Sequence, residues 1–290
     1  MADALTTIRD IERELARLRD ASGEPGAHPK LRTSVLTHMA WVPERWVEAA
    51  TETLAGLAER HPSRTILLFP RPEDREDSLE AEVDLRCFLR GGIEREVCSE
   101  VISIRLRGRR AAAPASVVEP LLVPDLPVFL RWRGECPWGS PELEELVDVT
   151  DRLIVDSSEW PNPEQGYDRL AQLLGRAVVS DIAWARTEPW RRAVATLWPE
   201  IAEASSMRVA GPRVEALLLA RWLGVRLGRE LEVEHEPAGE IELVDVDGHE
   251  ATPARFDRPT ASDLLSGQLE IFARDRIYEE AVRSFSSVAI

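Results

Sequence analysis

Polar and aromatic side chains gather where three predicted strands end. Arg131 and Trp132 close the apolar run PVFLRW, Asp156 ends the run RLIVD with Ser157 next, and Arg186 follows the run VVSDIAWA. In an open parallel sheet, ligands bind beyond the carboxyl ends of the strands. An arginine there can hold a phosphate or a carboxylate with two parallel N–H donors. The spacing therefore predicts a small-ligand cleft, and the alternative is a purely structural polar rim.

A second set of candidates consists of arginines in a chain that is otherwise acidic. Seven arginines and three glutamates lie between Arg86 and Arg110, and Arg105, Arg107 and Arg109 fall on one face of a predicted strand. This face could bind an acidic patch of a partner or a phosphorylated metabolite, or be paired with neighbouring acids. Arg64 lies at the start of another predicted strand. Its guanidinium could bind a carboxylate or a phosphate, or its hydrogen bonds could fix a local loop.

Trp184, Trp190 and Arg191 are candidates for anchors at a protein interface, because Trp and Arg dominate the binding energy of such interfaces. The alternative for them is core packing. The alternating glutamates of the segment 230–236 predict either a charged sheet edge that blocks strand addition or a docking surface for a basic partner.

The sequence lacks the common catalytic and cofactor-binding motifs. It has no G-x-G-x-x-G after a strand, no P-loop, no G-x-S-x-G, no H-E-x-x-H and no C-x-x-C, and its five histidines are far apart. We therefore predict no catalytic residue, no metal ligand and no cofactor, and we expect the protein not to be an enzyme.

Composition narrows the class of partner. The net charge of −16 argues against nucleic acid, whose phosphates such a surface repels. No apolar run approaches the ~18 residues of a membrane helix, and the N-terminus has no signal-peptide pattern. We therefore expect a cytoplasmic protein with no membrane partner. Its three cysteines, Cys87, Cys98 and Cys136, are expected to be reduced thiols there, although Cys87 and Cys98 could pair if they lie on adjacent strands.

Apolar periodicity predicts an α/β protein with mixed, mainly parallel sheets, flanking helices and an antiparallel meander near the C-terminus. An apolar strand in residues 33–42, a helix from 43 to about 60 and the strand TILLF at 65–69 predict one β-α-β unit. We further expect strands at 178–185, 252–256 and 268–273. A turn is expected at Asp247-Gly248.

Three parts follow from this pattern. Residues 1–30 are expected to form a helix and a linker, residues 31–160 one α/β domain, and residues 161–290 a second α/β domain. The apolar stripe of the first helix, at 2–19, is expected to dock on its own body or to mediate self-association.

Four stretches in order give the chain a resemblance to a known family. They are HPSR at 61–64, the segment 115–132 that contains ASVV, PDLPV and a terminal RW, DRLIVDS at 151–157, and DIAWAR followed by PWR at 181–191. Together they resemble the OpcA family of glucose-6-phosphate dehydrogenase assembly proteins. The sequence departs from the family pattern at Arg131, where an aromatic residue is more usual, and at Ala183, where asparagine is common.

The resemblance implies a non-catalytic partner of glucose-6-phosphate dehydrogenase. Members of the family accompany that enzyme, favour its active oligomer and raise its activity, and they thereby influence NADPH supply through the oxidative pentose phosphate pathway. The first hypothesis is accordingly an assembly factor or allosteric activator. The second is a sugar-phosphate sensor or an enzyme that uses the cleft at the strand ends.

Overall fold

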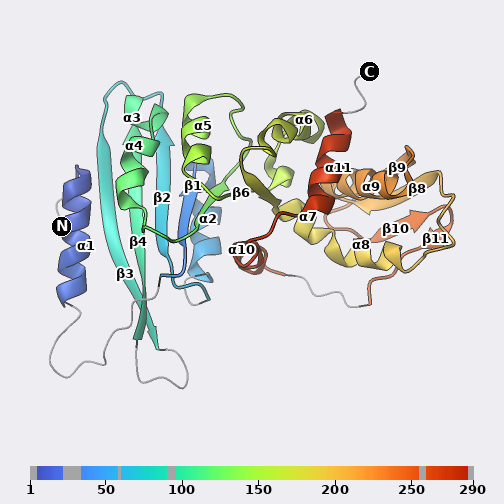
Figure 1. Ribbon diagram of the computed structural model, residues 1–290, viewed down its shortest axis with the longest axis horizontal. Coiled ribbons are helices and arrows are strands. Elements are labelled where there is room, and N and C mark those ends of the chain that lie inside the picture. The colour runs from blue at the N-terminus through green and yellow to red at the C-terminus, as the bar shows by residue number, and fades with distance from the viewer. Residues whose placement is uncertain (1–4, 22–33, 58–59, 90–95, 255–258, 287–290) are drawn as a thin grey trace. The chain divides into compact units, whose positions relative to one another are not determined.

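The computed structural model describes residues 5–21, 34–57, 60–89, 96–254 and 259–286 (Figure 1). The chain forms two compact units. The first comprises residues 1–154 and 261–270, and the second comprises residues 155–260 and 271–290. The boundary expected at 160/161 falls inside the second unit, and the expected linker after the first helix lies outside the described residues.

The first unit contains a mainly parallel sheet, as predicted. Within this unit the strand order is β3-β4-β2-β1-β5-β6, and only β3 runs antiparallel to its neighbour. The strands are β1 (Thr37–Trp41), β2 (Arg64–Arg71), β3 (Leu79–Leu89), β4 (Glu96–Arg107), β5 (Val128–Trp132) and β6 (Arg152–Val155). The apolar runs form its centre because both faces are covered: Ile66 and Leu68 of β2 are fully buried.

Helices pack on this sheet. They are α1 (Ile8–Ala21), α2 (Val47–Ala55), α3 (Arg109–Ala112), α4 (Ala115–Val118), α5 (Pro141–Asp148) and α10 (Ala261–Leu269), with short 3₁₀ turns η1 (Glu44–Trp46) and η2 (Glu119–Leu121). The expected β-α-β unit is confirmed as β1-α2-β2. The apolar stripe of α1 docks on its own body, because Ile11 and Leu15 are buried and the helix contacts β3.

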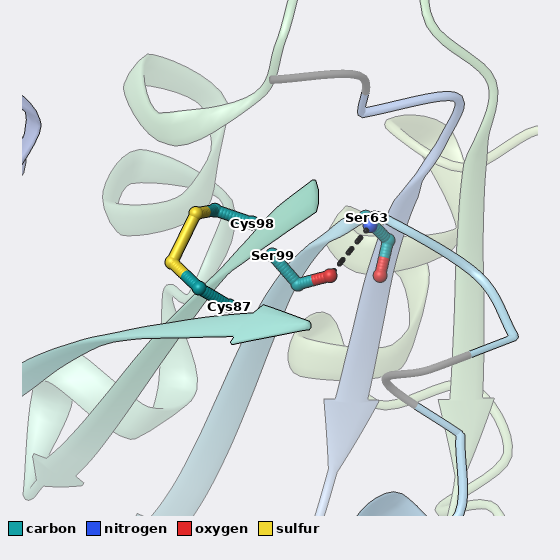
Figure 2. The surroundings of a disulfide bond; sticks show 4 residues. All are labelled: Ser63, Cys87, Cys98 and Ser99. Carbon is teal, nitrogen blue, oxygen red and sulfur yellow. Dashed lines mark hydrogen bonds between the residues drawn. A yellow bond between two sulfur atoms is a disulfide. The ribbon is translucent and has the colours of Figure 1, made fainter. Parts of the chain in front are cut away.

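A disulfide between Cys87 and Cys98 links β3 to β4 (Figure 2). The two residues are directly opposite each other in the antiparallel register, with Cα atoms 4.0 Å apart. The expectation of three reduced thiols was therefore wrong for this pair, since strand register brings the sulfurs together. Cys136 is a buried thiol.

The second unit holds a separate four-stranded sheet of order β11-β10-β8-β9. Its strands are β8 (Ser206–Gly211), β9 (Glu232–Pro237), β10 (Leu243–Val246) and β11 (His249–Glu250), and the unit also contains β7 (Val178–Asp181). Its helices are α6 (Pro163–Leu173), α7 (Ile182–Arg186), α8 (Glu188–Ala195), α9 (Arg213–Leu227) and α11 (Arg276–Ser286), with the 3₁₀ turn η3 (Ser157–Glu159). The pairs β8–β10 and β10–β11 are antiparallel, which confirms the α/β class with an antiparallel element. β9 runs parallel to β8 and does not pair with β10, because β8 lies between them.

Three strand predictions need correction. The strand expected at 178–185 ends at Asp181, because the Asp181 carboxylate accepts the N–H of Ala183 and starts α7. The third strand of the meander is β11 at 249–250, whereas the described residues of the expected 252–256 segment are not a strand. The strand expected at 268–273 is absent, since residues up to Leu269 continue α10, whose Ser262 hydroxyl donates to the carbonyl of Thr53.

The Asp247-Gly248 turn is confirmed. Both residues have positive φ angles, 47° and 85°, as a tight two-residue hairpin turn requires. Within the described ranges of the chain, none of the helices combines the length and the apolar character that a membrane crossing requires.

Reduction of the Cys87–Cys98 disulfide should destabilise the protein. The cross-link spans a sequence separation of 11 residues, and closing a loop of that size stabilises a fold by about 2–3 kcal/mol. Thermal unfolding of the wild type should therefore shift to lower temperature when a reductant is added, and the C87S/C98S double variant should show the same lowered transition with or without it. A wild-type transition that ignores the reductant would contradict the prediction.

Candidate functional site

The residues predicted at the strand ends of the second unit do come together, as an ion pair. The guanidinium of Arg186 in α7 donates to both carboxylate oxygens of Asp156, with Nη2–Oδ2 and Nη2–Oδ1 distances of 2.8 and 3.0 Å. The same nitrogen donates to the hydroxyl of Ser158, at 3.0 Å. Asp156 in turn caps η3 by accepting the Ser158 N–H. The N–H donors of Arg186, which were predicted to bind an external anion, instead bind a carboxylate of the same unit.

Next to this pair, Asp181 is the centre of a fully buried hydrogen-bond network. Its Oδ1 accepts the backbone N–H groups of Ser157, at 3.1 Å, and Ala183, at 2.9 Å. Its Oδ2 accepts the hydroxyls of Ser157, at 2.6 Å, and Tyr167, at 3.0 Å, with the Tyr278 hydroxyl at 3.4 Å. Burial, with the nearby Asp156 charge second, raises the pKa of Asp181, and burial likewise raises the pKa of Tyr167.

A third carboxylate, Glu215 in the first turn of α9, completes the cluster. Its Oε1 lies 3.5 Å from Nη1 of Arg186, and its buried Oε2 has no hydrogen-bond partner among the described residues. Burial raises the pKa of Glu215 to about 7, and the attraction of Arg186 opposes that shift. Asp156 and Glu215 thus share the guanidinium of Arg186 beside the buried Asp181, and the proton that Glu215 takes up near neutral pH relieves the excess of negative charge.

The hydrogen bonds of this cluster connect elements of secondary structure to one another. Ser157 is fully buried, so its hydroxyl is not offered to a substrate, although it bonds an aspartate. The bonds join η3, α6, the end of β7, α7, α9 and α11, which are distant in sequence. The side chains that were predicted to line a cleft in this unit therefore bond to other residues of the same unit.

The predicted tryptophan anchors lie in the core of the second unit. Trp184 and Trp190 are each 5% exposed. Arg191 stacks over the Trp184 ring, with its guanidinium carbon 3.5 Å from the ring centroid. The Trp184 indole N–H donates to Asp275 at 2.7 Å. Burial lowers the pKa of Arg191 to about 10.

The predicted residues of the first unit divide into buried and exposed sets. Trp132 is 1% exposed and stacks on Trp41, and the buried Arg131 donates to the Trp132 carbonyl. Arg64 donates from Nε and Nη2 to Oε2 of Glu100, at 2.8 and 2.6 Å, and from Nη1 to the carbonyl of Leu121. The Arg64 side chain therefore ties β2 to β4 and η2, which is more than a local loop contact.

Each of the three arginines from 105 to 109 lies beside an acid, but they do not share one strand face as predicted, because Arg109 begins α3 after β4 ends at Arg107. Arg105 and Arg109 are exposed, and Arg107 is half-buried. Arg105 pairs with Glu82, Arg107 lies 3.6 Å from both Asp74 and Glu80, and Arg109 donates to Asp77 at 2.6 Å. The Arg109 side chain is 92% exposed. Exposed pairs of this kind contribute little to stability, so these guanidinium groups can exchange partners at low cost.

No group of three or more potential metal ligands forms among the residues that the structure describes. His38 and His61 come near each other in the first unit, and burial lowers the pKa of His38 to about 3, so this ring is neutral at pH 7. Sequence reasoning missed Glu215 and the role of Tyr278. The available signal was a lone acid in α9, a helix whose other residues in the first two turns are almost all apolar.

Comparison with known proteins assigns both halves of the chain to one family. Its description is that of a glucose-6-phosphate dehydrogenase subunit. Residues 55–172 match the N-terminal domain of this family, and residues 177–282 match its C-terminal domain. The two matches follow each other in the expected order.

Curated relatives agree with this assignment. Three proteins carry names that assign them to the OxPP cycle as OpcA. The one from a Synechocystis strain is 29% identical over 187 residues, and those from Nostoc punctiforme and Synechococcus elongatus are each 25% identical, over 182 and 206 residues. The matches cover 59%, 59% and 66% of this chain but only 38%, 39% and 45% of those relatives. The chain therefore matches less than half the length of these relatives.

Replacing Glu215 by Gln should change how stability depends on pH. A carboxyl group whose pKa is raised by folding, here from 4.5 to about 7, contributes fully to stability below pH 4.5 and loses that contribution as pH rises to 7. The difference in unfolding free energy between E215Q and the wild type should therefore move in favour of E215Q between pH 5 and 7.5, by on the order of 3 kcal/mol.

Chemical denaturation at several pH values measures this difference. The matched control is E280Q, which removes an exposed carboxylate of α11 and should show a difference from wild type that stays flat over the same window. Parallel pH profiles for E215Q and the wild type would mean that folding does not raise the pKa of Glu215.

Replacing Arg64 by Ala should be strongly destabilising. The side chains of Arg64 and Glu100 are 11% and 8% exposed, and removing one member of a buried pair costs about 3–5 kcal/mol. The control R71A breaks a pair with Glu44 whose members are 43% and 75% exposed, and it should cost no more than about 1 kcal/mol. Equal losses for the two variants in denaturant titrations would show that burial does not set the strength of the Arg64 pair.

Proposed function

This chain belongs to the family of glucose-6-phosphate dehydrogenase assembly proteins, OpcA, and from that membership we propose that it binds glucose-6-phosphate dehydrogenase and favours its active oligomer. The observation that carries the proposal is the pair of family matches, which together span most of the chain in the right order. A protein of this kind acts by binding, in the cytoplasm where the dehydrogenase works, and supports NADPH production in the oxidative pentose phosphate pathway without catalysis of its own.

The internal bonds of the second unit support a binding role. Asp156, Ser157 and Arg186 satisfy one another, and Ser157 is fully buried. A catalytic serine needs an exposed hydroxyl beside a base, and an anion site needs a guanidinium that is free to fork onto the ligand. The arrangement therefore favours action through the outer surface over a sugar-phosphate site or an active site at these strand ends.

Activation requires a difference in affinity between two states of the enzyme. To shift an equilibrium from 1:99 to 99:1, a binder must prefer the favoured state by about 5.5 kcal/mol. An interface of ordinary size, about 1,600 Å², is sufficient for such a preference. We propose that the exposed Arg105 and Arg109, with the half-buried Arg107 between them in sequence, belong to that interface, because the acids that pair with Arg105 and Arg109 are exposed and a carboxylate of the enzyme could replace them.

Mixing the purified chain with glucose-6-phosphate dehydrogenase tests the proposal. We expect the rate of NADPH formation to rise with added chain, the two proteins to co-elute, and light scattering to report a shift of the enzyme to its larger oligomer. Unchanged activity together with separate elution would refute the proposed function.

A paired set of charge reversals tests the proposed surface. R105E/R109E should weaken the association about tenfold, equivalent to about 1.4 kcal/mol, because two favourable contacts become repulsive. The control R192E/R213E reverses two other exposed arginines, each paired with a single glutamate, and should leave the affinity unchanged. Equal affinities for both variants would place the interface elsewhere.

A further inference from the structure

The strand β9 forms one edge of the four-stranded sheet and has β8 as its single neighbour among the described strands (Figure 1). The N–H of Glu232 donates to the carbonyl of Ser205, and that of Ala238 donates to Gly211, so the backbone groups of the even-numbered residues point to β8. Backbone groups alternate in direction along an extended strand, and those of Val233 and His235 therefore point to the open edge. This edge can accept one more strand.

A groove of about 340 Å³, lined mainly by apolar residues, lies beside the same edge, between α9 and β9. The apolar part of its lining consists of Leu217, Ala220 and Val225 of α9 with Leu231 and Val233, and Arg221, Arg229 and Glu230 also line it. Val233 is 40% exposed, because no strand lies beyond β9 among the described residues. A strand added to β9 would place every second side chain over this groove.

The opposite face of β9 carries unbalanced negative charge. The side chains of Glu232, Glu234 and Glu236 share this face, are exposed, and form no ion pair among the described residues. The nearest cation in the strand register is Arg208 of β8, which lies opposite Glu234 on one side and Asp245 on the other. One arginine therefore faces several carboxylates, and a partner strand with basic side chains on this face would gain complementary contacts.

We propose that the β9 edge binds an extended segment of a partner protein as an added strand, and that this segment alternates basic and apolar side chains. The apolar side chains cover the groove, the basic ones lie beside the three glutamates, and the backbone bonds with Val233 and His235. The glutamates also select against other occupants. A second copy of this chain would set its own glutamates against them, and a neutral strand would leave the carboxylates without a counter-charge.

A designed peptide alone tests this inference, so the result does not depend on the proposed function. The probe is the capped peptide Lys-Val-Lys-Val-Lys-Val, titrated into the full chain and followed by NMR and by amide hydrogen exchange. The control peptide Lys-Lys-Lys-Val-Val-Val has the same composition without the alternation. We expect the alternating peptide to bind at least about tenfold more tightly, a difference of about 1.4 kcal/mol, and to protect the amides of Val233 and His235 from exchange.

Variants of the chain locate the site. E234K should weaken binding of the alternating peptide about tenfold, equivalent to about 1.4 kcal/mol, whereas E250K, on the opposite edge strand β11, should leave it within about twofold. V233P removes one outward N–H without touching the bonds to β8, and proline is tolerated on edge strands. This second variant should lose the protection at His235, and thermal unfolding of each variant checks that it is folded.

Three results with the peptides would overturn the inference: no binding of the alternating peptide at saturating concentration, equal binding of the two peptides, and binding that leaves Val233 and His235 unprotected. A fourth is dimers of the chain that E234K strengthens, because a second copy would then be the occupant of the edge.

Discussion

The burial of three neighbouring carboxylates, two of them paired with Arg186, is the constraint on which the second unit depends. Each buried anion needs donors, because an unpaired charge in a low-dielectric interior is costly. Asp181 obtains them from two backbone amides and three hydroxyls, and Asp156 obtains them from Arg186 and η3. Glu215 has no such set of donors and instead holds its proton up to near neutral pH. Every segment that supplies a donor is thereby fixed in place, including α6 and α11, which come from opposite ends of the unit.

This constraint also limits which part of the second unit can bind a ligand or a partner. Parallel strands that end in Asp, Ser and Arg are typical of ligand sites, yet here those side chains are saturated by one another. Buried hydrogen bonds at the strand ends connect the helices to one another, and a surface that is already ordered loses little entropy on binding. Family membership as an assembly protein fits this arrangement, since assembly needs a surface of fixed shape more than it needs an open pocket.

Sequence pattern predicted those elements whose physical cause is local. The apolar run of β2, the stripe of α1 and the paired positive-φ positions at Asp247 and Gly248 each follow from periodicity or turn chemistry. The errors arose where a distant contact decides. The Cys87–Cys98 disulfide depends on the register of β3 and β4, and the ending of β7 depends on a carboxylate that both caps a helix and binds two tyrosines. The sequence marks Glu215 as a lone acid in the apolar first turns of α9, but its pairing with Arg186 was not predictable, because only the folded chain sets the two side chains side by side.

The two sheets distribute charge differently. This difference makes the arginine surface tolerant of many acidic partners and the β9 edge selective for one kind of strand. On β4 and at the start of α3 the arginines are matched by acids of β3 and the turn before it, so binding there exchanges one ion pair for another and gains little per contact. On β9 the three glutamates form no such pairs among the described residues, and they flank both outward backbone groups and uncovered apolar surface. An edge that carries charge is ordinarily protected from strand addition, because most strands bring no counter-charge. The same charge gives specificity for a strand that alternates basic and apolar side chains. Such a strand bonds to the outward backbone groups, covers the groove and pairs with the carboxylates at the same time.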